Sequence, residues 1–351
     1  MKTEHILVIR FSAMGDVAMT VPVVWALAQQ YPHVRITVLS RPFARVFYEN
    51  LAPNVNFMAA DLKKEYHGVS GLNALYRRLI AKQFTAVADL HDILRSKYLR
   101  LRFNMGHYHV AHINKHRAEK RLLTRQKNKV MRQLPTSFEN YAEVFARLGY
   151  PVKTEGFRSL FGEGKGDLRL LPPQIGERRS FQQWIGVAPF AAHEGKIYPI
   201  DRMEQVVARL CQAHPSCRIF LFGGGKREME VFNRWTATYQ QCINASALLG
   251  SLQQELILMS HLNVMLCMDS ANLHLASLVA TPVVSVWGAT HPFAGFMGWG
   301  QQEENAVQVQ LPCRPCSVYG NKPCVRGDFA CMNNISVDDV CERVEKVLAM
   351  Q

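Results

Sequence analysis

The stretch HILVIRFSAMGDVAMTVPVVWAL (residues 5–27) decides the expected fold, because it holds a strand, a turn and a helix in quick succession. Its apolar run Ile6–Ile9 is typical of a buried strand, and Val17–Gln30 is expected to form a helix. The turn between them consists mostly of small residues, but it also carries one acid, Asp16. A strand that leads directly into a helix is the repeating unit of a parallel α/β sheet. The stretch therefore predicts that fold class and raises the question of why an acid stands at the turn.

The same alternation continues through the first half of the chain. The expected strands are 34–40, 54–61, 84–90 and 107–113, and the expected helices are 43–51, 72–82, 93–103 and 137–148. Gly149 and Pro151 are placed to end the last of these helices. Residues 151–181 lose the rhythm and are rich in glycine and proline, which is typical of a linker.

The alternation then restarts. The expected strands are 184–190, 217–225, 262–269 and 281–288, and the expected helices are 201–214, 227–239, 251–261, 272–278 and 336–350. Ser251 and Gln254 have the spacing of a capping box. We therefore expect two similar α/β domains with parallel sheets, over 1–165 and 166–351. Such sheets bind ligands beyond the carboxyl ends of their strands, so two of them facing one another would enclose a cleft.

Composition is ordinary for a soluble globular protein, with 48% hydrophobic and 20% charged residues in 351. No apolar run reaches the roughly 18 residues that span a bilayer, and the first residues do not resemble a secretory signal. The nine cysteines are an odd number, and most are scattered, which favours reduced thiols over a disulfide framework. These observations predict a cytoplasmic location.

Positive charge is concentrated in one segment. The chain has a net charge of +13, and residues 93–133 alone hold twelve lysines and arginines against one acid, Glu119. A field of one sign attracts an anion, such as nucleic acid, a phosphorylated substrate or an acidic membrane surface. A solvated helical face is the ordinary alternative.

Three further stretches place polar groups after expected strands. In APFAAHEGKIYP (188–199), Lys196 is placed to meet an anion, or else is a surface lysine. In MDSANLHLASLVATPVVSVWGATHP (268–292), Asp269 precedes a helix whose first amides can bind phosphate, and His274 follows as either a site or a core residue. Gly223–Gly225 allow close approach of a ligand to the backbone. Asp16 itself is as well explained by a helix N-cap as by catalysis.

Nucleotide-binding signatures of other classes are missing from the sequence. The chain contains no G-x-x-x-x-G-K-[ST] loop and no dinucleotide fingerprint, so hydride transfer gains no support. The second half thus offers phosphate-binding helix starts, and the first half a carboxylate and a basic surface. A nucleotide-linked donor in one half and an acidic acceptor in the other fit this division.

In combination, the opening stretch, GKIYP, MDSANLHLASLVATPVVSVWGATHP and CRPCSVYGNKPCVRGDFACMNNIS (313–336) resemble glycosyltransferase family 9, the heptosyltransferases of lipopolysaccharide inner-core synthesis. The resemblance implies a GT-B architecture of two Rossmann-like domains. It also implies inverting, metal-independent transfer of a heptose from ADP-heptose to a sugar hydroxyl.

Matching motif positions imply roles for individual residues. Asp16 would be the general base, next to Ser12, Met14 and Gly15 on the acceptor side. Lys196 would neutralise the leaving diphosphate, and Asp269 would bind the sugar. The other implied donor contacts are Gly224, Glu228, Ser270, Ala271, Asn272 and His274.

The implied acceptor is a lipid-linked, phosphorylated sugar at the inner face of the cytoplasmic membrane. We expect Arg117, Lys120 and Arg121 of the basic segment to bind it, so that charge reversal there raises the acceptor KM more than the donor KM. The same segment would suit an anionic membrane surface.

The resemblance implies no cofactor, but the spacing Cys313-x2-Cys316-x7-Cys324-x6-Cys331 leaves open a structural zinc ion. Three alternatives to heptosyl transfer also remain at this point. One is a nucleic-acid-binding protein that uses residues 93–133, although no nucleic-acid-binding motif occurs there. The second is a non-catalytic sugar-binding module, and the third is a family 9 transferase with a different nucleotide sugar.

Overall fold

The chain forms two compact units in the computed structural model, which describes residues 4–350. The first unit runs to Lys115 and resumes over Pro135–Leu160, and the second holds His116–Leu134 and everything from Phe161 onward. The expected boundary at 165/166 thus lies five residues beyond the observed one. The larger difference is that residues 116–134, expected in the first domain, pack with the second unit.

A five-stranded parallel sheet forms the centre of the first unit, in the order β3-β2-β1-β4-β5. Its strands are β1 (His5–Ile9), β2 (Arg35–Ser40), β3 (Val55–Ala59), β4 (Ala86–Asp89) and β5 (His109–His112). The central strand β1 is buried throughout, as its run of apolar residues predicts. Ile9, at its carboxyl end, pairs with Leu39 on one side and Asp89 on the other.

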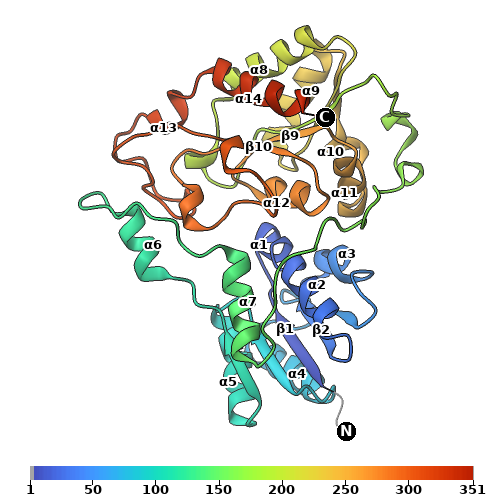
Figure 1. The fold of residues 1–351 in the computed structure, drawn as a ribbon, viewed down its shortest axis with the longest axis vertical. Helices are drawn as coiled ribbons and strands as arrows, with labels where there is room; N and C mark the ends of the chain where they lie inside the picture. The colour runs from blue at the N-terminus through green and yellow to red at the C-terminus, as the bar shows by residue number, and fades with distance from the viewer. Residues whose placement is uncertain (1–3, 351) are drawn as a thin grey trace. The chain divides into compact units, whose positions relative to one another are not determined.

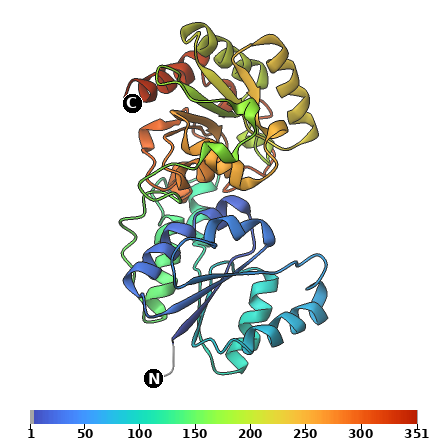
Figure 2. The same ribbon diagram turned by 90° about the vertical axis from the view of Figure 1, so that its right-hand side faces the viewer.

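Helices lie on both faces of this sheet (Figures 1 and 2). They are α1 (Met14–Ala18), α2 (Val21–Gln30), α3 (Arg45–Tyr48), α4 (Gly68–Ile80), α5 (Leu94–Met105) and α7 (Ser137–Arg147). Helix α4 packs against α5, and α2 packs against α7. Leu75 and Leu79 of α4 and Leu99 of α5 enter the core beside Leu7 and Val87 of the sheet.

The helix predicted over Val17–Gln30 is split in two, which corrects the expectation. Pro22 explains the break, because proline has no N–H and its ring clashes with the carbonyl four residues earlier, here that of Ala18. Helix α2 therefore starts afresh, with Pro22 in its first turn. The result is a separate five-residue helix, α1, that contains Asp16.

A six-stranded parallel sheet forms the centre of the second unit, in the order β11-β10-β9-β6-β7-β8. Its strands are β6 (Trp184–Ala188), β7 (Arg218–Leu221), β8 (Cys242–Asn244), β9 (Val264–Met268), β10 (Val283–Val286) and β11 (Ala306–Val307). The two short edge strands, β8 and β11, were not predicted. Two or three residues carry too little periodicity to be recognised.

Helices cover both faces of the second sheet as well. The helices of the second unit are α8 (Ile200–Ala213), α9 (Lys226–Thr238), α10 (Ala245–Leu248), α11 (Leu252–Ser260), α12 (Ala271–Leu278), α13 (Ala330–Asn333) and α14 (Val337–Ala349), together with α6 (Arg117–Thr124), which lies apart from the sheet. Helices α8 and α14 pack together, and α14 also contacts β9 and β10. At α11, Ser251 Oγ accepts from Gln254 N at 3.3 Å, but the Gln254 side chain accepts from Gly250 N instead of closing the predicted capping box.

The chain order of the strands reverses once in each sheet. In the first sheet β2 and β4 flank β1, and in the second sheet β7 and β9 flank β6. Loops leave in opposite directions at such a switch point, so a crevice opens beyond the carboxyl ends of the two central strands. The loops after β1 and β4, and those after β6 and β9, are therefore where ligands are expected. The prediction of two parallel α/β domains is confirmed.

Within residues 4–350, no helix is both long enough and apolar enough to cross a membrane.

Candidate active site

Asp16 lies on α1, just beyond the end of β1, at the switch point of the first sheet. Its Oδ2 accepts a hydrogen bond from Ala13 N at 3.1 Å and forms an ion pair with Arg10 Nη2 at 2.7 Å. About a third of its side chain (32%) stays exposed. Asp16 thus closes its own turn, as a cap would, and still presents a carboxylate to solvent.

Arg10 is the residue that holds Asp16 in place. Its side chain is only 7% exposed, and its Nη1 donates to Leu90 O, on the loop after β4, at 2.6 Å. Because this buried guanidinium spans from the loop after β4 to the α1 turn, the carboxylate has little freedom to rotate away. Arg10 was not among the predicted site residues, although it opens the R-x-S-x-x-G-D pattern that ends at Asp16.

His91 fixes the other side of the same turn. Its Nδ1 accepts from Phe11 N at 3.3 Å, and its Nε2 lies 3.4 Å from Ser12 Oγ. Burial, with the positive charges of Arg10 and Lys115, lowers the pKa of His91 to about 3. The ring is therefore neutral at pH 7, and because Nδ1 accepts, its proton is on Nε2, facing Ser12.

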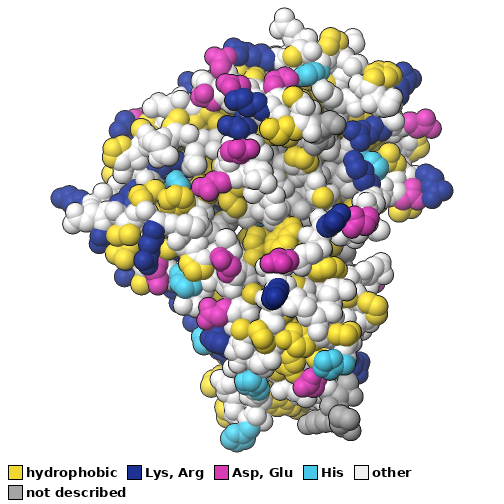
Figure 3. Space-filling model, in the orientation of Figure 1, with side chains coloured by type: hydrophobic (Ala, Val, Ile, Leu, Met, Phe, Trp, Pro, Cys, Tyr) yellow, Lys and Arg dark blue, Asp and Glu magenta, His cyan; other side chains and the backbone are white. Residues whose placement is uncertain are grey.

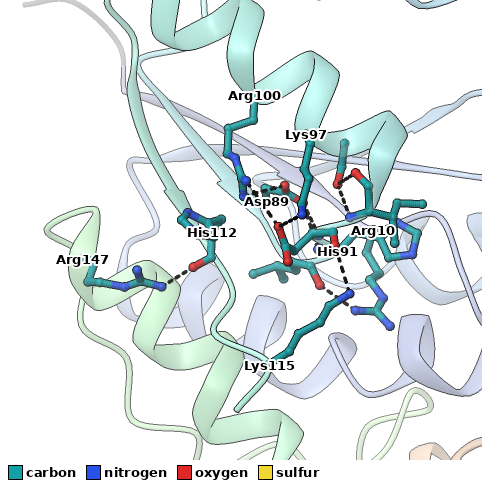
Figure 4. Close-up of polar contacts among 12 residues, drawn as sticks. Arg10, Asp89, His91, Lys97, Arg100, His112, Lys115 and Arg147 are labelled. Carbon is teal, nitrogen blue, oxygen red and sulfur yellow. Dashed lines mark hydrogen bonds and ion pairs between the residues drawn. The ribbon is translucent and has the colours of Figure 1, made fainter. Parts of the chain in front are cut away.

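A buried network holds the loop after β4 (Figure 4). Asp89 is fully buried, and its Oδ1 accepts from His91 N at 2.9 Å and Asp92 N at 3.0 Å. Arg100 of α5 pairs with Asp89 at 3.2 Å and with Asp92 at 3.3 Å. Lys115 Nζ donates to Asp92 O at 3.2 Å. Arg100 and Lys115, two bases of the segment 93–133, thus help to hold this loop in place.

The structure divides the predicted acceptor residues into two groups. Ser12, Met14 and Gly15 lie on the same turn as Asp16. Arg117, Lys120 and Arg121 lie on α6, in the second unit. Lys120 is buried, with its Nζ 4.3 Å from the centre of the Phe296 ring. Its side chain therefore packs against Phe296 and is not exposed to a ligand. We therefore withdraw Lys120 from the acceptor residues.

In the second unit, Lys196 and Asp269 meet at the switch point between β6 and β9. Lys196 Nζ lies 2.9 Å from Asp269 Oδ2, and the two side chains are 16% and 5% exposed. The Lys196 loop is tied to the end of β10 by a hydrogen bond from Ala289 N to Gly195 O at 2.8 Å. Two residues that lie 73 positions apart and were singled out separately thus form one pair.

Helix α12 begins next to this pair. Ser270 is its N-cap, and the Ser270 side chain makes no capping hydrogen bond. Ser270 Oγ is buried and has no hydrogen-bond partner among residues 4–350. Ala271 and Asn272 form the first turn, and His274 is buried behind them. An N-terminus whose amides are not capped by their own side chain can accept an anion.

Glu228 organises the glycine loop between β7 and α9. Its Oε2 accepts from Gly224 N at 2.7 Å. A Cβ atom at Gly223 would lie 2.2 Å from that same oxygen, whereas one at Gly224 would meet nothing within 4 Å. The predicted donor residues Gly224 and Glu228 are thus in contact. Residue 223 must be glycine for this contact, because a Cβ atom there would collide with the Glu228 carboxylate.

The four late cysteines line one small cavity together with Arg314. Burial raises the pKa of Cys316 and raises that of Cys331 to about 11. At Cys324, burial is outweighed by hydrogen bonds from backbone N–H groups, which lower its pKa. Among the described residues, no group of three or more histidines, cysteines or acids is arranged to hold a metal ion. The zinc ion stays a prediction from spacing alone.

Comparison with known proteins identifies the class. Residues 72–324 match the model of glycosyltransferase family 9 (heptosyltransferase). The chain is 23% identical over 297 residues to lipopolysaccharide core heptosyltransferase OpsX of Haemophilus influenzae, covering 82% of this chain and 80% of that protein.

Solved structures show the same fold. The family 9 glycosyl transferase from Veillonella parvula aligns with a TM-score of 0.74 at 18% identity, over 100% of this chain and 99% of that one. Heptosyltransferase WaaC of E. coli with ADP aligns with a TM-score of 0.65 at 18% identity, over 98% and 99%. Two parallel α/β units with polar switch points agree with this match. The chain belongs to glycosyltransferase family 9, the heptosyltransferases.

Proposed function

We propose that the protein transfers a heptose from ADP-heptose to a hydroxyl of a lipopolysaccharide inner-core acceptor, with inversion at the anomeric carbon. The observation that carries the proposal is Asp16, a partly exposed carboxylate held by Arg10 and Ala13 N beyond the central strand of the first sheet. The family match and the names of the relatives support the donor and acceptor class. WaaC of E. coli has also been solved with ADP-2-deoxy-2-fluoro heptose.

The reaction that we propose uses Asp16 as its base. Asp16 takes the proton of the acceptor hydroxyl as its oxygen attacks the anomeric carbon. The bond from that carbon to the diphosphate breaks, and its electron pair leaves with ADP. Attack from the face opposite ADP inverts the configuration. Transfer requires that the two switch points face one another when both substrates are bound.

We assign the leaving diphosphate to Lys196 and the start of α12. Lys196 balances the charge of Asp269 in the structure, and a bound diphosphate would share that ammonium. The uncapped amides at Ser270–Asn272 supply a second positive pole. In this proposal these groups stabilise the charge of the leaving diphosphate, as a metal ion does in other transferases. We therefore propose that transfer needs no metal and survives treatment with EDTA.

The acceptor that we propose is lipid-linked and phosphorylated, which places the protein at the inner face of the cytoplasmic membrane. The name of the Haemophilus relative supports an acceptor in the lipopolysaccharide core. No observation in the structure favours nucleic acid as the partner.

The test is Asp16→Asn, which keeps the size of the side chain and removes the base. We expect kcat to fall by about 10² to 10⁴, while the Kd for ADP-heptose, measured by calorimetry, stays within about twofold of wild type, since the donor binds elsewhere. Asp61→Asn is the matched control, because Asp61 is a partly exposed carboxylate of the same unit whose Oδ1 accepts from Lys63 N at 2.9 Å. Its kcat should not change.

The proposal fails if Asp16→Asn retains wild-type turnover. A panel of other nucleotide sugars, assayed with the wild-type protein, tests the sugar. Turnover with one of them and none with ADP-heptose would retain the transferase and exclude heptose.

A further inference from the structure

Residues 116–134, here called the arm, consist of α6 and the loop that follows it, and their inner side is built into the second unit. Leu123 and Leu134 are buried with Ala294. Leu134 N donates to Phe293 O at 2.9 Å, and Lys129 Nζ donates to Cys313 O and Pro315 O, both at 2.8 Å. The arm is therefore held at both ends and is not a loose basic tail.

The charged side chains on the outer side of the arm are almost all positive. The arm holds seven lysines and arginines and one acid, Glu119. Glu119 lies 3.6 Å from His116. Because Lys120 and Lys129 point inward, the remaining bases form the outer charge. The exposed ones are Arg117, Arg121, Arg125, Lys127 and Arg132.

Apolar side chains are exposed among these bases. Leu122, Val130 and Met131 are 36%, 37% and 43% exposed. A hydrogen bond from Val130 N to Leu122 O at 3.1 Å closes the loop, which brings two of them together. Figure 3 shows dark blue and yellow side chains side by side over α6 and its loop, at the left of the view.

We propose that the outer side of the arm docks on an anionic lipid surface. Lysines and arginines that are unopposed by acids attract anionic headgroups, and apolar side chains beside them can enter the boundary between headgroups and acyl chains. A nucleic acid would satisfy the bases but would leave Leu122, Val130 and Met131 in water. Because the inner side is already packed, little ordering is needed on binding.

This surface deepens the proposed function by naming where the protein meets the membrane, but the binding itself does not depend on the transfer chemistry. It also changes the expected role of Arg117 and Arg121. Both would meet lipid headgroups, so their reversal should raise the KM for a membrane-embedded acceptor more than the KM for a water-soluble truncated acceptor.

The test is co-sedimentation of the full chain with vesicles of phosphatidylcholine alone or mixed with phosphatidylglycerol. We expect binding to the mixed vesicles only, weakened by salt. The triple variant Arg121→Glu, Arg125→Glu, Lys127→Glu should bind at least about a hundredfold less, because about 1 kcal/mol is lost for each of the three bases. The pair Val130→Ser, Met131→Ser should also bind less, without any change in charge.

Arg179→Glu with Lys346→Glu is the matched control, because both are exposed bases of the second unit outside the arm. It should bind like wild type, and all variants should keep the wild-type melting temperature, since the altered side chains are exposed. The proposal is overturned if the control loses as much binding as the triple variant, if the apolar pair binds normally, or if duplex DNA is bound more tightly than the vesicles. Transfer to a truncated soluble acceptor reports separately on the proposed function.

Discussion

At the scale of single residues, Asp16 is not the N-cap that the sequence offered as an alternative to catalysis, because Ala13 is the N-cap of α1 and Asp16 is the third residue of the helix. It accepts from Ala13 N within its own turn, and it pairs with Arg10 while remaining about one-third exposed. The motif around Asp16 was sufficient to single it out. Arg10 stands in the same motif, six positions before the acid with which it pairs. His91 could not be recognised in this way, because it contacts Phe11, 80 positions away in the sequence.

The buried neutral His91 makes a prediction about acid stability. Its pKa is about 3 in the folded chain, against 6.5 for an unperturbed histidine. Between these values the unfolded chain binds a proton that the folded chain does not. The free energy of unfolding therefore falls as the pH falls from about 6.5 toward 3, by up to about 1.4 kcal/mol per pH unit.

His91→Asn removes this contribution, so its free energy of unfolding should fall less steeply with acid than that of the wild type. The measurement is urea unfolding from pH 7 to pH 4.5. His109→Asn, a change at an exposed histidine of β5, should keep the wild-type slope. Equal slopes for wild type and His91→Asn would show that His91 takes up its proton in the folded state.

At the scale of elements, most strands and helices were predicted, whereas the edge strands β8 and β11 and helix α6 were not. The buried runs of β1, β6 and β9 and the amphipathic helices α8 and α14 were all expected close to their observed bounds. Helix α6 was missed because its eight residues are mostly polar or charged, and only packing against Phe293 and Phe296 reveals its inner face. The pairing of Lys196 with Asp269 depends on strand order, which local sequence does not specify.

The Lys196 loop is sensitive to one glycine in the cysteine-rich segment. A Cβ atom at Gly320 would lie 2.4 Å from Lys196 Cγ. Gly320→Ala should therefore displace the lysine from Asp269 and weaken ADP binding, measured by calorimetry, by about tenfold, roughly one charge-assisted hydrogen bond.

Gly300→Ala separates this effect from backbone strain. Gly300 has φ +66°, close to the +75° of Gly320, but a Cβ atom there would meet nothing within 4 Å. Both variants should lose similar stability, whereas only Gly320→Ala should lose affinity for ADP. Equal affinities would show that Lys196 does not contact the diphosphate.

At the scale of the whole molecule, the chain passes between its two units three times, after residues 115, 134 and 160. The second unit is therefore not a continuous piece of sequence. A fragment of residues 161–351 would lack the arm and expose Ala294, Phe293 and Phe296, which Leu123 and Leu134 otherwise cover.

We expect that fragment to melt at a lower temperature than the same fragment carrying residues 116–134 through a flexible linker, and to bind more of a dye that reports exposed apolar surface. Thermal unfolding of the two fragments makes the comparison. Identical melting temperatures would mean that the arm adds no stability to the second unit.

These three crossings between the units also affect how hybrids of this protein and its relatives should be designed. One simple hybrid would join the chain of one relative up to about residue 160 to the remaining residues of another. Its arm would then come from one protein and the rest of its second unit from the other. The arm would then face aromatic partners with which it did not evolve. A hybrid designed to change the donor preference should therefore take residues 116–134 and the residues after 160 from the same relative.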